Sequence, residues 1–204
     1  MKKLFLAVFA VFALSTASFA GGWGLGVKLG AGQNDPKSMK NDHDSGGGTL
    51  TEASGVFAIE GLYEWDMAGK NVKDTGSDNK IGLRFGFDFY GQNKLEQPGF
   101  TAKENTISLP ITVYYKHNSG IKNVSWYAGA GFTSISTELE VPGDTIKEDK
   151  IFPHIMAGAE YRFTKLFALG LDLKYNFNAK ITKKGAVLSD RTGLQGVLAA
   201  RFYF

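Results

Sequence analysis

The 204-residue sequence contains no cysteine. Disulfide bonds, zinc–thiolate sites and cysteine nucleophiles are therefore excluded. Beyond the N-terminal region there is no apolar run of about 18 residues, so we expect no helical membrane span. Neither sign of charge dominates, with 23 Lys and Arg against 20 Asp and Glu. Without a concentrated basic face we expect no nucleic-acid partner. Nucleotide-binding, zinc-protease and nucleophile-elbow motifs are also missing.

The first twenty residues have the three parts of a secretory signal peptide. Lys2 and Lys3 supply the positive start, residues 4–14 form an unbroken apolar run, and Ser18-Phe19-Ala20 offers small residues for cleavage. An uncleaved membrane anchor is the alternative, but the run is short for a membrane helix. The sequence therefore predicts a signal peptide over 1–20 and one mature domain over 21–204.

The C-terminal segment alternates between apolar and polar side chains. Leu194, Leu198 and Phe202 share one parity, whereas Gln195 and Arg201 share the other. A period of two predicts a β-strand with two different environments. The same pattern predicts eight strands, at residues 23–33, 55–65, 80–90, 104–117, 124–137, 152–163, 166–178 and 192–204. The second is the least regular, and Pro110 predicts a local bulge in the fourth.

The predicted connections differ in length. Polar segments at 34–54, 91–103, 138–151 and 179–191 predict four loops, whereas 118–123 and 164–165 predict short turns. The connection at 66–79 should lie on the same side of the barrel as these two short turns, but it is longer than either of them. The glycine run at 46–48 predicts a mobile loop in which substitutions should be nearly silent.

Side-chain volume distinguishes a membrane barrel from a soluble one. Strands of this length match tilted membrane strands, which need about 9–11 residues. The apolar parity is bulky and aromatic, whereas the polar parity is rich in glycine and alanine. An eight-stranded barrel has a narrow interior that side chains fill. The small and charged set should therefore line the lumen and the bulky set should face lipid. A secreted soluble barrel would reverse this facing.

Two short segments and the leader carry a resemblance to a known family. Residues 158–163, Gly-Ala-Glu-Tyr-Arg-Phe, and the terminal Arg201-Phe202-Tyr203-Phe204 resemble small outer-membrane β-barrels of the porin family, of the OmpA and OmpX types. The resemblance implies an all-β, eight-stranded antiparallel up-and-down transmembrane barrel in the bacterial outer membrane. It also implies contact with outer-membrane lipid and lipopolysaccharide, and recognition of the last strand by the barrel insertion machinery.

Inward-facing charges form the main candidate site. In a narrow barrel each buried charge must find a partner or water. The set comprises Lys28, Glu60, Arg84, Lys116, Glu160, Arg162, Asp172 and Arg201. A salt-bridged plug that fills the lumen is the favoured interpretation, and a selectivity ring in a small pore is the alternative.

Aromatic residues form a second group. With the N-terminus in the periplasm, they should form a belt at the periplasmic interface, where rings with one wet and one apolar edge collect. Its members are Trp23, Trp65, Tyr115, Trp126, Tyr161 and Phe204.

Three shorter motifs could carry chemistry. His117 and Ser119 resemble the His-x-Ser pair of lipid A deacylases, but they fall at a predicted periplasmic turn. Asp42-His43-Asp44 could bind a divalent ion, and a solvated loop is favoured instead. Lys183-Lys184 could meet lipopolysaccharide phosphates. We assign no catalytic, cofactor-binding or metal residue and expect no enzyme activity.

The sequence supports three functional hypotheses. The first is a plugged barrel with a structural or surface-interaction role through its extracellular loops. The second is a narrow porin-like channel for small or apolar solutes, and the third, more remote, is a lipid-modifying outer-membrane enzyme. The ligand of the loops is unknown at this stage.

Overall fold

The computed structural model describes residues 21–67, 79–183 and 185–204. The predicted signal peptide and most of the 66–79 connection lie outside the described residues. The elements are β1 (Gly21–Gly32), α2 (Lys37–Gly46), β2 (Thr49–Thr51), β3 (Gly55–Asp66), β4 (Lys80–Tyr90), β5 (Asn93–Gln97), β6 (Phe100–Asn118), β7 (Val124–Val141), β8 (Asp144–Arg162), β9 (Phe167–Asn176), β10 (Lys180–Lys183), β11 (Ala186–Asp190) and β12 (Gly193–Tyr203). Within these ranges no helix is both long and apolar enough to cross a bilayer.

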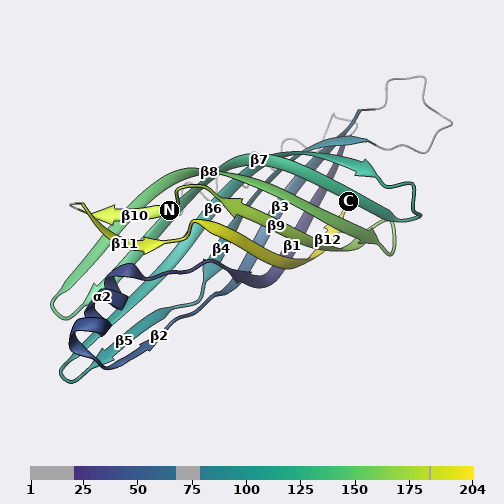
Figure 1. The fold of residues 1–204 in the computed structure, drawn as a ribbon. Coiled ribbons are helices and arrows are strands. Elements are labelled where there is room, and N and C mark those ends of the chain that lie inside the picture. The colour runs from purple at the N-terminus through teal and green to yellow at the C-terminus, as the bar shows by residue number, and fades with distance from the viewer. Residues whose placement is uncertain (1–20, 68–78, 184) are drawn as a thin grey trace.

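Eight of the strands close into an antiparallel barrel (Figure 1). Each pairs with its neighbour in the order β1, β3, β4, β6, β7, β8, β9 and β12. The first and last then pair with each other, from Gly24 with Tyr203 to Gly32 with Gln195. This ring leaves no open sheet edge along the barrel wall, as a strand-built membrane span requires. The predicted fold class is confirmed.

The barrel has two unlike ends. The turns at 119–123 and 163–166 lie at one end, which we call the turn end. At the opposite end α2, β2, β5 and the β10–β11 hairpin gather beyond the wall, and we call this the loop end (Figure 1).

The side-chain facing follows the predicted parity. Leu171 and Leu198 are 48% and 69% exposed on the outer surface, whereas Arg84 and Asp172 are 4% and 3% exposed inside. The bulky apolar parity therefore covers the outside and the polar parity lines the lumen. A soluble barrel would show the opposite arrangement, so that alternative is rejected.

The irregular strand β3 has the same facing, with apolar side chains outside and polar side chains in the lumen. Phe57 and Ile59 are exposed and Glu60 is buried. Tyr63 is only 7% exposed although it shares the outer parity. It is covered because its ring packs between Trp23 and Trp65, with both centroid distances 4.6 Å.

The four predicted loops contain more structure than their composition suggested. Residues 34–54 hold α2 and β2, residues 91–103 hold β5 and the start of β6, and residues 179–191 hold the β10–β11 hairpin. The charged segment 138–151 is not a loop at all, because β7 and β8 continue to a turn at Pro142-Gly143. Glu138 pairs opposite Lys147 there, with their charged atoms 2.9 Å apart. Opposite charges on facing strands stabilise a ribbon without apolar alternation.

Two local expectations are wrong. The register between β4 and β6 is the same on both sides of Pro110, so the strand carries a gap in pairing rather than a bulge. The glycine run at 46–48 is also less tolerant than expected. Gly47 and Gly48 have positive φ, and a Cβ at Gly48 would lie 2.3 Å from the Glu96 carbonyl oxygen. Substitution there would strain the backbone.

Candidate functional site

Arg201 forms the centre of the lumen network. It extends from β12 and its side chain is fully buried. Its Nε donates to Glu60 Oε1 at 2.7 Å, and its Nη2 donates to both Asp172 oxygens at 2.6 and 2.7 Å. A third carboxylate, on Glu160, lies 3.4 Å from Nη1. One guanidinium thus neutralises groups from three other strands.

Two further cations complete this layer. Arg84 lies 3.3 Å from Glu60 and donates to Asp172 at 3.1 Å. Lys28 reaches the same two carboxylates, at 2.5 and 3.1 Å. Side chains from strands on opposite walls therefore contact one another across the barrel axis. In a low-dielectric interior such charges are retained only when paired in this way.

A second layer lies closer to the turn end. Lys116 donates to Glu64 at 3.0 Å and to Glu160 at 2.8 Å. Arg162 approaches Glu160 at 3.5 Å and covers the Tyr203 ring at 4.2 Å. All eight residues that the sequence analysis proposed for the lumen are thus joined in one connected network. Glu64 belongs to it as well, although it was not among the eight.

A third layer, nearer the loop end, was missed. Lys174 donates to Asp88 at 2.6 Å across the lumen. Both residues lie on the predicted inward parity, so their position could have been inferred although their pairing could not. Higher still, the buried Arg191 donates to Glu104 at 3.0 Å and stacks on Tyr90 at 4.4 Å. No sequence signal indicated Arg191, because it is the last residue of the segment 179–191, which composition assigns to a loop.

His154 lies inside the barrel wall between two hydroxyl groups. Its Nε2 is 2.8 Å from Thr112 Oγ1 and its Nδ1 is 2.9 Å from Thr133 Oγ1. Both ring nitrogens are thus engaged with neutral partners. His154 thus acts as a hydrogen-bonding group of the lumen wall.

Little free space remains beside the network. A cavity of about 30 Å³ lies at mid-lumen, with Lys28, Asp88, Lys174 and Gln195 among its lining residues. That volume has room for only a small number of water molecules.

Inward glycines make room for the large side chains that fill the lumen. A Cβ at Gly158 would lie 2.5 Å from a ring carbon of Tyr127, and one at Gly170 would lie 2.4 Å from Arg201 Nη1. Tyr127 donates a hydrogen bond to Asp172 and accepts one from Arg201 at 2.9 Å. The glycines on the inner parity are thus the spatial complement of the tyrosine and arginine plug.

The six proposed belt residues lie on the outer surface at the turn end. Phe204 is 69% exposed, and the main chains of Trp23 and Phe204 exchange hydrogen bonds of 3.2 and 2.9 Å. Tyr115 and Trp126 meet at 6.4 Å between centroids. Tyr161 begins a row of packed rings that extends to Phe163, Phe167 and Phe202, with successive centroid distances of 4.7, 5.8 and 5.1 Å. Aromatic rings therefore line much of this rim.

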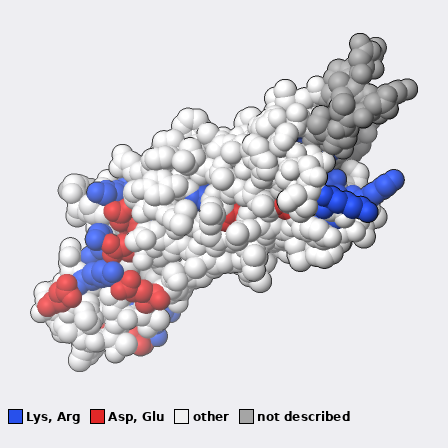
Figure 2. Space-filling model, turned by 45° about the vertical axis from the view of Figure 1, so that its right-hand side comes forward, with Lys and Arg blue, Asp and Glu red and all other residues white. Residues whose placement is uncertain are grey.

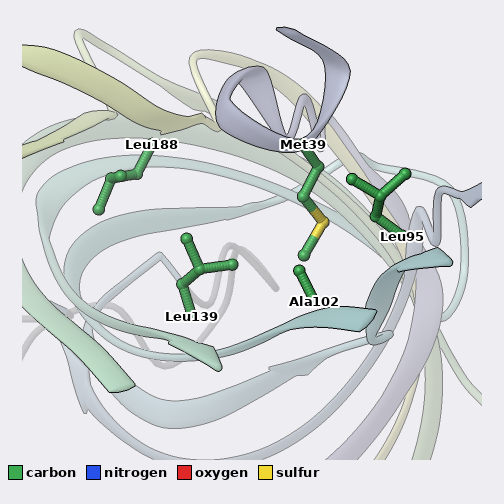
Figure 3. Close-up of a cluster of buried hydrophobic side chains, with 5 residues drawn as sticks. All are labelled: Met39, Leu95, Ala102, Leu139 and Leu188. Atoms are coloured by element: carbon green, nitrogen blue, oxygen red, sulfur yellow. The ribbon is translucent and has the colours of Figure 1, made fainter. Parts of the chain in front are cut away.

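The loop end carries its own apolar core. Met39 points from α2 into a group of side chains contributed by four other elements (Figure 3). The buried members are Met39, Leu95, Ala102, Leu139 and Leu188. We call α2, β2, β5, β10, β11 and the adjoining ends of β6, β7 and β8 the loop-end head. Because its connections share one core, the head is folded rather than a set of separate loops.

Charged contacts attach α2 to the rest of the head. Asp35 binds Lys37 at 2.5 Å and Lys40 at 3.1 Å, and Lys40 also reaches Glu52 at 3.1 Å. Burial acts to raise the pKa of Asp35, but the two lysines together outweigh it and hold that pKa below its usual value. These contacts orient the helix that carries Met39.

Two of the three shorter motifs are not assembled into sites, whereas the third includes Lys184, which lies outside the described residues. Asp42 and Asp44 are exposed on α2, and the described residues contain no group of three acidic or histidine side chains placed to hold a metal ion. His117 Nδ1 lies 2.6 Å from Asn79 Oδ1, whereas Ser119 Oγ donates to the Val124 carbonyl at 2.9 Å. The base and the hydroxyl are each engaged with another residue.

The sequence matches the family described as outer membrane protein beta-barrel domain over residues 4–202. The chain belongs to this family. It has the apolar outer surface and the closed eight-stranded wall of a bacterial outer-membrane β-barrel. The protein is therefore located in the bacterial outer membrane. No curated protein matches the chain.

Solved outer-membrane barrels share the fold at low sequence identity. Ail, the attachment invasion locus protein of Yersinia pestis, is 13% identical with a TM-score of 0.54, and the match covers 90% of this chain and 99% of Ail. A major outer membrane protein of Thermus thermophilus is also 13% identical, with a TM-score of 0.52 and coverage of 91% and 100%. OprG of Pseudomonas aeruginosa is 11% identical, with a TM-score of 0.51 and coverage of 91% and 97%. The likeness of this outer-membrane β-barrel to all three is one of fold.

Proposed function

We propose that this outer-membrane β-barrel is a non-enzymatic structural or surface-interaction protein that displays the loop-end head outside the cell. The lumen network around Arg201 carries the proposal. Its arginines, tyrosines and carboxylates occupy the axis of the barrel, and the neighbouring cavity has room for only a small number of water molecules. A filled barrel suits a rigid support better than a solute path.

The unequal ends support the direction of display. Outer-membrane barrels combine short periplasmic turns with longer extracellular loops. Two of the turns at the turn end are short, whereas the loop end carries α2 and extra strands beyond the wall. The turn end with its aromatic belt would then face the periplasm.

The head offers a surface on which a partner could bind. A groove of about 400 Å³ runs between α2 and the β10–β11 hairpin. Lys37, Asn41, Lys180 and Asp190 line its polar sides, and Leu188 contributes to its apolar part. A groove in a folded head is pre-organised, which lowers the entropic cost of binding.

The outer wall, the loop end and the last strand support three further partners. The belt and the apolar outer surface fit contact with outer-membrane lipid, and the loop end would meet lipopolysaccharide. The exposed Phe202 and Phe204 on and after β12 fit recognition by the barrel insertion machinery. All three contacts are part of the proposal.

Display of the head can be tested with an epitope tag on intact cells. The tag is inserted after Gly143, at the tip of the β7–β8 ribbon, where a Cβ would meet nothing within 4 Å. The matched control places it after Gly120, which is equally open but lies in the turn between β6 and β7. Antibody should label intact cells for the first insertion only, and both insertions after permeabilisation. Labelling of the Gly120 insertion on intact cells would contradict the proposed orientation and place the turn end outside the cell.

The plugged lumen can be tested by electrical recording. Purified protein in planar bilayers should give no steady unitary current, because the salt bridges close the axis in several layers. A general porin prepared in the same way provides the positive control. Steady openings of the wild-type protein would replace the surface-interaction proposal with the channel hypothesis.

A further inference from the structure

The two short turns of the turn end lie side by side and expose the same kinds of side chain. Arg162 N donates to the Asn123 carbonyl at 2.9 Å, which joins the end of one turn to the start of the other. In the first turn, Lys122 is exposed beside Ile121, which is 65% exposed. In the second, Lys165 is exposed beside Leu166, which is 60% exposed. Each turn thus presents one cation next to one large apolar side chain.

These cations have no acidic neighbour on the turns. Residues 117–123 and 162–167 contain neither Asp nor Glu. The nearby Glu160 is buried and already binds Lys116 and Arg201. Among the described residues, neither Lys122 nor Lys165 has an ion-pair partner. Figure 2 shows basic side chains protruding from this end, whereas the loop end mixes both signs.

The turns continue the membrane-facing surface. Trp126 and Tyr161 lie just inside the turns on β7 and β8 and are 46% and 44% exposed. Such rings sit at headgroup depth in a bilayer. Apolar side chains at the turn tips therefore remain within the interface, and the lysines beside them reach the level of the lipid phosphates.

We propose that the turns at 119–123 and 163–166 form a binding surface for anionic phospholipid headgroups in the leaflet at the turn end. Ile121 and Leu166 would contact the acyl-chain boundary, while Lys122 and Lys165 bind phosphate oxygens. Charge complementarity and continuity with the apolar wall both favour lipid over a soluble partner. The inference is independent of what the loop-end head binds.

Tryptophan quenching can measure this preference. In a Trp23→Phe/Trp65→Phe background, Trp126 is the only tryptophan in the chain and lies beside both turns. The protein is reconstituted into vesicles that contain phosphatidylglycerol or phosphatidylcholine with brominated acyl chains, and the relative binding constant follows from quenching. A lysine near an anionic headgroup contributes roughly fivefold to binding, so the pair should favour phosphatidylglycerol by about twenty-fivefold. Lys122→Gln/Lys165→Gln should abolish most of that preference.

The control removes two lysines at the other end of the molecule. Lys94→Gln/Lys147→Gln deletes two cations of the loop-end head, whose side chains are 37% and 67% exposed, and should leave the preference unchanged. Salt provides a test without substitution, because raising it from about 0.01 M to about 1 M shortens the Debye length from about 30 to about 3 Å and should suppress the preference. Equal binding of both lipids by the parent protein, or a preference that persists in Lys122→Gln/Lys165→Gln, would overturn the proposal.

Discussion

Replacement of Arg201 by methionine should lower the free energy of unfolding by about 3–5 kcal/mol. The guanidinium is fully buried and lies within 3.4 Å of carboxylate oxygens from Glu60, Glu160 and Asp172. Methionine fills similar space but leaves those carboxylates with fewer cations in a site that water hardly enters. The energetic cost arises from the hydrogen bonds and the cation that the buried carboxylates lose rather than from a lost packing contact.

Equilibrium unfolding in urea with the protein in lipid vesicles, followed by tryptophan fluorescence, measures this effect. The matched control is Arg162→Met, which removes an arginine that is 31% exposed and has one ion pair at 3.5 Å. That variant should lose no more than about 1 kcal/mol. Equal losses in the two variants would show that burial and the number of partners do not determine the strength of the network.

A compensating variant separates charge from packing. Adding Lys28→Met, Arg84→Met, Glu60→Gln and Asp172→Asn to Arg201→Met removes the whole central layer of charges, because Lys28 and Arg84 would otherwise lose the two carboxylates that they bind. Because buried ion pairs can often be replaced by neutral groups at little net cost, stability should recover in part. If this quintuple variant were less stable than Arg201→Met alone, shape rather than electrostatics would dominate the lumen.

The wall of the barrel could be predicted from sequence because one physical rule governs it. Every strand must present one parity to lipid and the other to a narrow lumen, so hydrophobicity and volume alternate together. Leu171 beside Asp172 illustrates the rule, since one is exposed outward and the other buried inside. The same rule located the eight predicted lumen residues without showing which of them pair.

The loop-end head could not be predicted because its strands are not defined by alternation. Glu138 and Lys147 stabilise β7 and β8 through opposite charges across the ribbon, a pattern that composition assigns to a loop. The core around Met39 draws single apolar residues from segments far apart in the chain. The burial of Arg191 depends on that assembly as well. Local periodicity carries no information on such contacts.

Replacement of Leu171 by arginine should cost about 2–4 kcal/mol, because a cation on the lipid face near mid-membrane loses its hydration without gaining a partner. Leu171 is outward and half-exposed, and its neighbours in register are Ala159 on β8 and Leu198 on β12. Urea unfolding in vesicles gives the free energy. Ile121→Arg provides the control at the turn end, where depth is shallow and the cost should be about 0–1 kcal/mol. If the two variants lost equal stability, Leu171 would lie outside the hydrocarbon region, and the assignment of the apolar parity to lipid would fail with it.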